Sequence, residues 1–207
     1  MSIKLVVFDF DGTLVDTRKI FLGIVKKNVE KHGFKLDKKF VKDFGNVPLK
    51  KAMEFISKDN ETLSSIIDDI AKDFIEHAKD VHPCKNLKNL KNLTQEKIIL
   101  SNSVSDFIEI ALEKLNIDFF SEVHGADTFD TKFDELKKII KRKKLNVDEV
   151  IYVGDRPVDI KLARKVGCRV VVVSNSSSWS TKKDLLENGP NFIIGDLKEL
   201  KTIISKL

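Results

Sequence analysis

Short, uninterrupted apolar runs recur along this 207-residue chain, and each is followed by a segment with helical periodicity. Continuous apolar runs are typical of parallel strands that are covered on both faces. Their alternation with helices predicts an α/β fold built on a doubly wound parallel sheet. Strands are expected at 3–8, 97–100, 149–153, 169–173 and 191–194, with a possible further strand at 121–125, and helices at 104–116, 133–144, 157–166, 181–188 and 196–206.

One long interval interrupts this rhythm, because it contains helical patterns and no strand signal. A first helix in it should end at Gly33, a second should open at Pro48, and a third should be capped at Asn60. An insertion of this length predicts a small helical domain that follows the first strand. The expected domains are an α/β core of residues 1–15 and 82–207 and a helical domain of residues 16–81.

Polar clusters follow directly on three of the predicted strands. A buried strand offers little structural reason for Asp9, and a surface turn would account for Asp11 alone. Because the carboxyl ends of parallel strands lie along one edge of an open sheet, these clusters should converge where ligands bind. Their members are Asp9 and Asp11 after the first strand, Ser101 and Asn102 after the second, and Asp155 and Asp159 after the third.

The converging carboxylates predict a metal site. Carboxylates brought together repel one another, and their ionisation is costly unless a cation joins them. All the candidate ligands are oxygens, which favours a hard cation, most naturally Mg²⁺. Because Mg²⁺ commonly binds substrate phosphates in proteins, a phosphate ester is the expected ligand.

The cluster after the second strand supports an anion site. Ser103 and Asp106 have the spacing of a capping box, which would open a helix there. Backbone amides around Asn102 would then face anionic oxygens, and Ser101 could add a hydroxyl donor. An ordinary strand-to-helix loop with a cap fits the same residues.

Taken in order, these motifs resemble those of the haloacid dehalogenase-like (HAD) superfamily. The matching residues are Asp9-Phe10-Asp11-Gly12-Thr13, Ser101, a lysine and Gly154-Asp155 with Asp159. The helical insertion after the first strand is similar to the C1 cap of the phosphoglycolate phosphatase-like branch. The resemblance covers essentially the whole chain and implies a Rossmann-like sheet with a small all-helical cap domain.

The resemblance also implies roles in catalysis. Asp9 would be the nucleophile that forms an aspartyl-phosphate, and Asp11 would protonate the leaving oxygen and then activate water. Ser101 and the Asn102 amide would bind the phosphoryl oxygens. The Gly12-Thr13 segment would complete the phosphate site, with Thr13 orienting Asp9.

The same resemblance implies the metal ligands and a lysine. Mg²⁺ would be held by the side chains of Asp9 and Asp155, by the backbone carbonyl of Asp11, and by Asp159 directly or through water. The lysine, which would steady the nucleophile and the transferring charge, is assigned to Lys132. The prolines that usually surround it in the family are missing here, so Lys137 and Lys138 stay as fallback candidates.

These features favour a Mg²⁺-dependent phosphatase that acts on a small phosphorylated metabolite. Asp11 speaks against a dehalogenase, because displacement of halide needs no proton donor at that position. A sugar-phosphate mutase stays open, although such relatives tend to carry Glu-Asp where this chain has Gly154-Asp155. A non-catalytic phosphate-binding or regulatory protein is the third possibility. Arg18 and the 43–48 loop are candidate contacts for the leaving group.

Composition narrows the partners. The net charge of +5 comes from scattered lysines, and no basic run is interleaved with aromatic residues, so nucleic acid is not an expected partner. No apolar run is long enough to span a bilayer, so no membrane association is expected either. Cys84 and Cys168 lack metal-ligand spacing and are predicted to be free thiols in a reducing, cytoplasmic compartment. A monomer or homodimer is expected.

Overall fold

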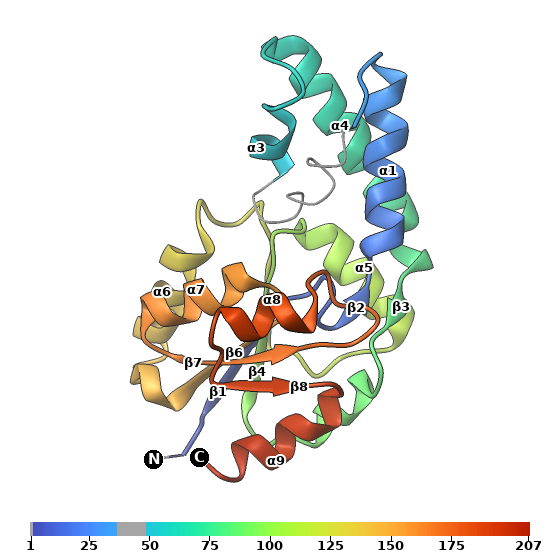
Figure 1. Ribbon diagram of the computed structural model, residues 1–207. Coiled ribbons are helices and arrows are strands. Elements are labelled where there is room, and N and C mark those ends of the chain that lie inside the picture. Colours follow the sequence, from blue (N-terminus) through green and yellow to red (C-terminus); the bar gives the residue numbers. More distant parts are fainter. Residues whose placement is uncertain (1, 37–48) are drawn as a thin grey trace.

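A computed structural model describes residues 2–36 and 49–207 of the chain. Its main feature is a six-stranded sheet in which all neighbouring strands are parallel, in the order β5-β4-β1-β6-β7-β8 (Figure 1). The strands are β1 (Leu5–Phe8), β4 (Glu96–Leu100), β5 (Glu122–His124), β6 (Val150–Gly154), β7 (Arg169–Val173) and β8 (Phe192–Ile194). The predicted doubly wound α/β fold is confirmed, and the segment at 121–125 contains a strand.

Strand β1 lies at the centre of the sheet, and all four of its residues are buried. It pairs with β4 on one side and β6 on the other, so that Leu5 lies opposite both Glu96 and Val150. Because the strand has neighbours at both edges and helices on both faces, it can be apolar throughout. The next residue, Asp9, therefore leaves the sheet between the ends of β4 and β6.

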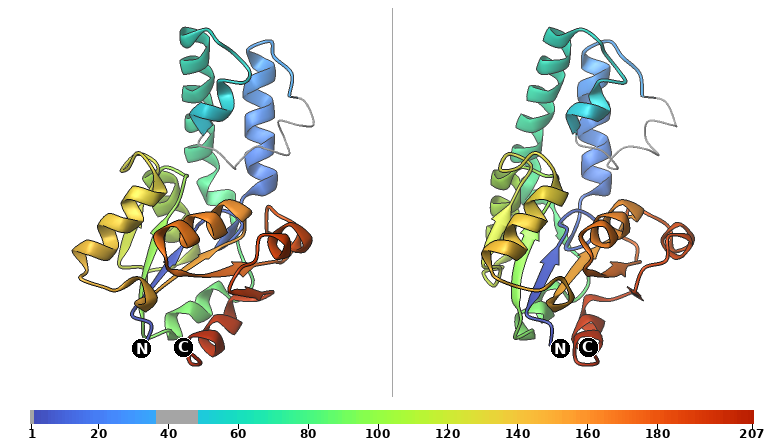
Figure 2. Two further views of the ribbon diagram at one scale, coloured as in Figure 1. Left: turned by 60° about the vertical axis from the view of Figure 1, so that its left-hand side comes forward. Right: turned by 90° about the vertical axis from the view of Figure 1, so that its left-hand side faces the viewer.

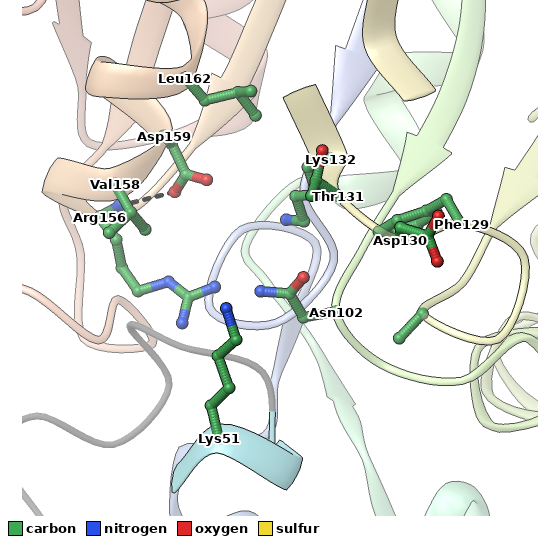
Figure 3. A pocket seen from close by; sticks show the side chains of 11 residues that line it. Lys51, Asn102, Phe129, Asp130, Thr131, Lys132, Arg156, Val158, Asp159 and Leu162 are labelled. Atoms are coloured by element: carbon green, nitrogen blue, oxygen red, sulfur yellow. Dashed lines mark hydrogen bonds between the residues drawn. The ribbon is translucent and has the colours of Figure 1, made fainter. Parts of the chain in front are cut away.

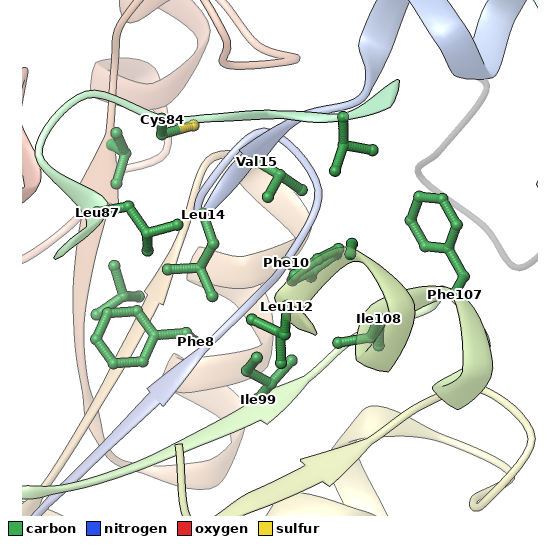
Figure 4. Close-up of a cluster of buried hydrophobic side chains, with 14 of the residues drawn as sticks. Phe8, Phe10, Leu14, Val15, Cys84, Leu87, Ile99, Phe107, Ile108 and Leu112 are labelled. Carbon is green, nitrogen blue, oxygen red and sulfur yellow. The ribbon is translucent and has the colours of Figure 1, made fainter. Parts of the chain in front are cut away.

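Helices cover both faces of the sheet (Figures 1 and 2). Side chains alternate along β1, with Val6 and Phe8 packing in one apolar cluster and Leu5 and Val7 in the other. Figure 4 shows part of the first cluster, where Phe8 lies among side chains of the neighbouring elements. The first cluster includes residues of α5 (Ser105–Leu115), α9 (Leu200–Ile204) and the 3₁₀ helices η2 (Leu87–Asn92) and η4 (Leu197–Glu199); the second includes residues of α6 (Lys132–Arg142), α7 (Pro157–Val166) and α8 (Lys182–Glu187).

The inserted segment stands beyond the carboxyl ends of the strands, at the opposite end of the molecule from the chain termini (Figures 1 and 2). Its described helices are α1 (Arg18–Lys31), α3 (Leu49–Met53), α4 (Asn60–His77) and the 3₁₀ turn η1 (Ala78–Asp80). Helix α4 is capped one residue before the predicted position, because the Asp59 carboxylate accepts a hydrogen bond from the Thr62 amide at 2.8 Å. Pro48 and the 43–48 loop lie outside the described residues.

Two short strands join the insert to the sheet domain. Strand β2 (Val15–Asp16) pairs antiparallel with β3 (His82–Pro83), so the outgoing and returning chains form a ribbon. These strands carried no signal in the sequence, because two residues are too few to show a period. The predicted division into a core and a helical domain stays a prediction, and both of its boundaries fall on this ribbon.

Helices α1 and α4 pack side by side and share buried polar contacts. The Asn28 amide donates to Asp73 Oδ2 at 2.7 Å, and Lys27 Nζ contacts the same oxygen at 2.9 Å. Both Asn28 and Asp73 are buried, so the pair fixes the register of the two helices. No helix within residues 2–36 and 49–207 is long and apolar enough to cross a membrane.

Candidate active site

Asp9 lies at the end of β1 and is completely buried. Its Oδ1 accepts hydrogen bonds from Lys132 Nζ at 2.8 Å and from the Phe10 amide at 2.9 Å, and its Oδ2 accepts one from Arg156 at 3.2 Å. Burial raises the pKa of Asp9, but the charges of Lys132 and Arg156 outweigh it and hold the pKa below its ordinary value. The carboxylate is thus kept ionised, as a nucleophile must be.

The lysine beside Asp9 is Lys132, the first residue of α6. The helix begins there because the side chain of Thr131 caps it, accepting a hydrogen bond from the Asp134 amide at 3.1 Å. Lys132 Nζ also lies 3.2 Å from the Tyr152 hydroxyl. The fallback candidates at 137 and 138 are exposed on the outer side of the helix. The structure therefore places Lys132, the residue chosen from the sequence, next to Asp9, the predicted nucleophile.

Asp11 is also buried, but its carboxylate faces hydroxyl groups. Its Oδ2 accepts hydrogen bonds from Ser103 Oγ at 2.6 Å and from Ser101 Oγ at 3.3 Å. Burial and the neighbouring charge of Asp9 raise the pKa of Asp11. The predicted capping box at Ser103 is wrong: the N-cap of α5 is Val104, and the Ser103 hydroxyl is turned toward Asp11 instead.

Asp155, at the end of β6, is completely buried beside the loop that carries Gly12. Its Oδ2 accepts a hydrogen bond from the Trp179 amide at 2.5 Å, and its Oδ1 accepts one from Thr13 Oγ1 at 3.5 Å. Gly12 has a φ of +76°, and a Cβ there would collide with the carboxylate of Asp155 and the ring of Trp179. Thr13 thus contacts Asp155 and not Asp9, which differs from the predicted orienting role.

Asp159 lies in the first turn of α7 and folds back over the end of β6. Its Oδ2 accepts hydrogen bonds from the backbone amides of Asp155 at 3.2 Å and Arg156 at 3.0 Å. A Cβ at Gly154 would strike this carboxylate, which explains the glycine before Asp155. The pairing of glycine and aspartate therefore has a steric cause.

Three carboxylates meet at this point. Asp9, Asp155 and Asp159 each offer an oxygen, and these oxygens all lie within 4.8 Å of one another. Burial and like charges raise the pKa of Asp159 and raise that of Asp155 well above its ordinary value. An all-oxygen set that is costly to ionise fits a hard divalent cation. The carboxylate of Asp11 lies outside this set; its backbone carbonyl, the ligand implied by the resemblance, stays a prediction.

Arg156 is a site residue that the sequence reading missed. The residue is only 5% exposed, and its guanidinium donates to Asp9 and lies 3.9 Å from Asp155 Oδ1. Burial lowers the pKa of Arg156, but the surrounding aspartates raise it by more than burial lowers it, so the guanidinium stays charged. The sequence did contain a signal for this role, because Arg156 lies between Asp155 and Pro157 at the end of a predicted strand, where the other site residues gather.

A cavity of about 300 Å³ opens beside these residues (Figure 3). Lys132, Arg156 and Asp159 line it from the sheet domain, together with Asn102, while Ser101 is completely buried. Lys51 of α3 reaches the cavity from the insert. Arg18, a predicted contact for the leaving group, is exposed and does not line this cavity.

Comparison with known proteins shows the family of the chain. The family model for haloacid dehalogenase-like hydrolases matches residues 6–173, which include every residue of the site described above except Trp179. The chain belongs to the haloacid dehalogenase-like hydrolases. The family predicted from the motifs is therefore confirmed, and with it the assignment as a hydrolytic enzyme.

Curated relatives of this HAD-like hydrolase match over nearly their full length. It is 28% identical to a phosphoglycolate phosphatase of Vibrio cholerae, with 98% of this chain and 97% of that protein covered. It is 24% identical to the pyrophosphatase PpaX of Oceanobacillus iheyensis, with 99% and 98% covered. The crystal structure of a predicted phosphatase from Clostridium acetobutylicum superposes with a TM-score of 0.84 at 22% identity, covering 100% of both chains, and shares the fold.

The loop of residues 174–181 borders the active site of this HAD-like hydrolase. The sequence of this loop, which follows a core strand, favours a flexible loop with Trp179 partly packed over a loop that borders the site. The structure places the Trp179 ring against Phe21 of α1, with ring centroids 5.4 Å apart, and its amide on Asp155. The loop thus links the insert to the carboxylate cluster.

Proposed function

We propose that the protein is a Mg²⁺-dependent phosphatase that hydrolyses a small phosphorylated metabolite through an aspartyl-phosphate. The observation that carries this proposal is the contrast between Asp9 and Asp11. The pKa of Asp9 is lowered by two cations, whereas that of Asp11 is raised by burial and by Asp9. Two carboxyl groups two positions apart are thus suited to opposite roles, one as an ionised nucleophile and the other as a proton donor.

The metal part of the proposal rests on the donor set. Asp9, Asp155 and Asp159 would hold the ion through carboxylate oxygens, which suits Mg²⁺. When bound, Mg²⁺ supplies positive charge that offsets the aspartates and the phosphoryl oxygens. The chain itself provides two further positive groups at this place, Lys132 and Arg156.

The reaction then follows from the positions of the side chains. A carboxylate oxygen of Asp9 attacks phosphorus, the bond from phosphorus to the leaving oxygen breaks, and Asp11 transfers its proton to that oxygen. Asp11 next takes a proton from water, whose oxygen attacks the phosphorus of the aspartyl-phosphate. Inorganic phosphate departs and Asp9 is regenerated. Lys132, 2.8 Å from Asp9 Oδ1, stabilises the charge on the transferring group.

The substrate proposal is a small phosphate ester or anhydride. A cavity of about 300 Å³ lies at the lower end of the usual range for small-molecule sites. The names of the curated relatives, phosphoglycolate phosphatase and pyrophosphatase, support substrates of that size.

The proposal is tested by hydrolysis of p-nitrophenyl phosphate with Mg²⁺, with EDTA, and by Asp9→Asn in Mg²⁺. Turnover should require Mg²⁺ and should fall by roughly 10³-fold or more in Asp9→Asn, because the amide is a poor nucleophile. Asp68→Asn, which alters an exposed carboxylate of α4, is the matched control and should keep full activity. Wild-type protein that binds Mg²⁺ but turns over no member of a broad phosphate-ester panel would instead support the non-catalytic alternative.

We also propose a cytoplasmic location. Cys84 and Cys168 are both free and buried in the structure. Unpaired cysteines are typical of proteins from reducing compartments. Determination of where the tagged protein accumulates in fractionated cells tests this point.

A further inference from the structure

The insert contributes a cation to the active-site cavity. Lys51 lines the cavity from α3, and Figure 3 shows its ammonium group directed toward the same space as the guanidinium of Arg156 and the amide of Asn102. Lys132 and Arg156 are hydrogen-bonded to Asp9. Lys51, by contrast, forms an ion pair with no carboxylate in the part of the chain that the structure describes. Among the described residues, none neutralises its charge, so we take this charge to face the ligand.

The position of this charge matters because of what surrounds it. A phosphoryl group at Asp9 would leave the remainder of the substrate on the side of the cavity where Lys51 lies. A negative charge on that remainder would be repelled by the buried aspartates, unless a cation faced it from the far side. Lys51 and Arg156 also repel each other across the shared space, and an anion between them would relieve that repulsion.

The lining of the cavity places Lys51 in the same space as the groups beside Asp9. The volume of about 300 Å³ is bordered by Lys51 of α3 as well as by Lys132, Arg156 and Asp159, so a small ligand that fills it contacts residues of both the sheet domain and the insert. A carboxylate or phosphate on the leaving group of such a ligand would lie beside Lys51. A neutral hydroxyl at the same place would gain much less, because hydrogen bonds to charged groups are the stronger ones.

We propose that Lys51 is a specificity-determining residue that binds a second anionic group of the substrate, a carboxylate or a phosphate on the leaving group. This inference rests on the proposed phosphatase function and narrows it to small substrates that carry two anionic groups. Lys51 acts on substrate choice and takes no part in the chemistry at Asp9.

The test compares four substrates: 2-phosphoglycolate, pyrophosphate, 2-hydroxyethyl phosphate and p-nitrophenyl phosphate. The first two carry the second anion as a carboxylate or a phosphate, and the others carry none. The wild-type protein should favour at least one doubly anionic substrate over 2-hydroxyethyl phosphate. In Lys51→Ala, kcat/KM for that substrate should fall about 10- to 100-fold, mainly through KM, while the two neutral leaving groups change less than about 3-fold.

Two variants control for structural damage. Lys51→Arg should keep most of the preference, because it preserves the charge, and Lys72→Ala removes an exposed lysine of α4 that does not line the cavity. An equal loss for all four substrates in Lys51→Ala would overturn the inference, since it would indicate a structural role.

The inference and the proposed function fail in distinguishable ways. Turnover of p-nitrophenyl phosphate that depends on Asp9, without any preference for a second anion, would overturn the role of Lys51 and leave the phosphatase intact. If the wild-type protein hydrolysed none of the four substrates and none of a broader ester panel, the proposed function would fall, and this inference with it.

Discussion

Two of the clusters of charged side chains in the described part of the chain differ in their balance of positive and negative charge. The site cluster comprises Asp9, Asp11, Lys132, Asp155, Arg156 and Asp159. The peripheral cluster comprises Glu96, Glu122, His124, Glu135, Arg142 and Lys143, and lies around β5 at the edge of the sheet. Carboxylates outnumber permanent cations four to two in the first, whereas two cations and a histidine face three carboxylates in the second.

In the peripheral cluster the ionised form of the central carboxylate is favoured. Glu122 accepts hydrogen bonds from Lys143 at 2.6 Å and from His124 at 2.9 Å, and it also pairs with Arg142. Burial raises the pKa of Glu122, but these partners outweigh it and lower the pKa to about 2. The charges of this cluster therefore stabilise the fold.

In the site cluster the ionised form is mostly disfavoured. The pKa values of Asp11, Asp155 and Asp159 are all raised, with burial as the largest cause. Only Asp9 has enough positive charge beside it to keep its pKa low. Charged groups that oppose folding are typical of sites that bind a ligand or carry out a reaction. The comparison therefore indicates a structural role for the peripheral cluster and a functional role for the site cluster.

The largest expected effect is the response to Mg²⁺. Because the ion would join three carboxylates that repel one another, saturation at about 100 times Kd should stabilise the protein by about 2.7 kcal/mol. For a chain of this size that corresponds to a rise in Tm of roughly 5–10 °C. Differential scanning calorimetry with Mg²⁺ and with EDTA measures the shift.

Binding of Mg²⁺ can also be followed by tryptophan fluorescence. Trp179 is the only tryptophan of the chain, and its amide is bound to Asp155, so its fluorescence should change as Mg²⁺ binds. Glu122→Gln should keep both responses, and Asp155→Asn should lose most of both. An unchanged response in Asp155→Asn would contradict the assignment of the site cluster as the metal site.

A smaller effect is expected from Asp155→Asn in EDTA. The amide keeps an acceptor for the Trp179 amide but removes one of several like charges, so the metal-free protein should gain about 1–2 kcal/mol. Thermal unfolding in EDTA provides the measurement, with Asp68→Asn as the exposed control. A clear fall in Tm would mean that the aspartates of the site stabilise the fold, and the contrast between the clusters would disappear.

The smallest expected effect is a loss of stability in Glu122→Gln at neutral pH, opposite in sign to the gain expected for Asp155→Asn. Loss of the carboxylate should destabilise the protein by about 1 kcal/mol, since the group is partly exposed and solvent screens it. Because folding lowers the pKa of Glu122 from 4.5 to about 2, its carboxylate stabilises the folded protein at any pH above 4.5. This stabilisation is lost as the pH falls from 4.5 toward about 2. Urea unfolding of both proteins from pH 7 to pH 3 should therefore show the difference shrinking, and a difference independent of pH would contradict the ion-pair explanation.

Local patterns were sufficient for much of the fold. Continuous apolar runs such as Leu5–Phe8 predicted the strands correctly, because a strand buried on both faces can be apolar at every position. The helix signals of α1 and α4 were equally direct, with an error of one residue at the cap on Asp59. The ribbon of β2 and β3 could not be predicted, because pairing between residues so distant in sequence leaves no local signal.

The candidate site shows the same division. Aspartates at strand ends indicated where charge would gather, since all parallel strands end at one edge. The structure also places Lys132, and not its exposed neighbours Lys137 and Lys138, beside Asp9. The hydrogen-bond partners of the hydroxyl groups were not predicted correctly. Ser103 Oγ donates to Asp11 and Thr13 Oγ1 donates to Asp155, and these contacts depend on how the loops pack together.

From the amino-acid order alone one obtains the strands, the helices, the edge at which the aspartates meet and the family to which the motifs belong. The first three follow from periodicity and from spacing along the chain, which are local properties, and the family follows from the resemblance of the motifs. The tertiary structure decided that Arg156 turns inward onto Asp9, that Trp179 connects α1 with Asp155, and that Lys51 reaches the cavity. Those contacts join elements remote in sequence, and their energies depend on burial and mutual distance, which exist only in the folded chain.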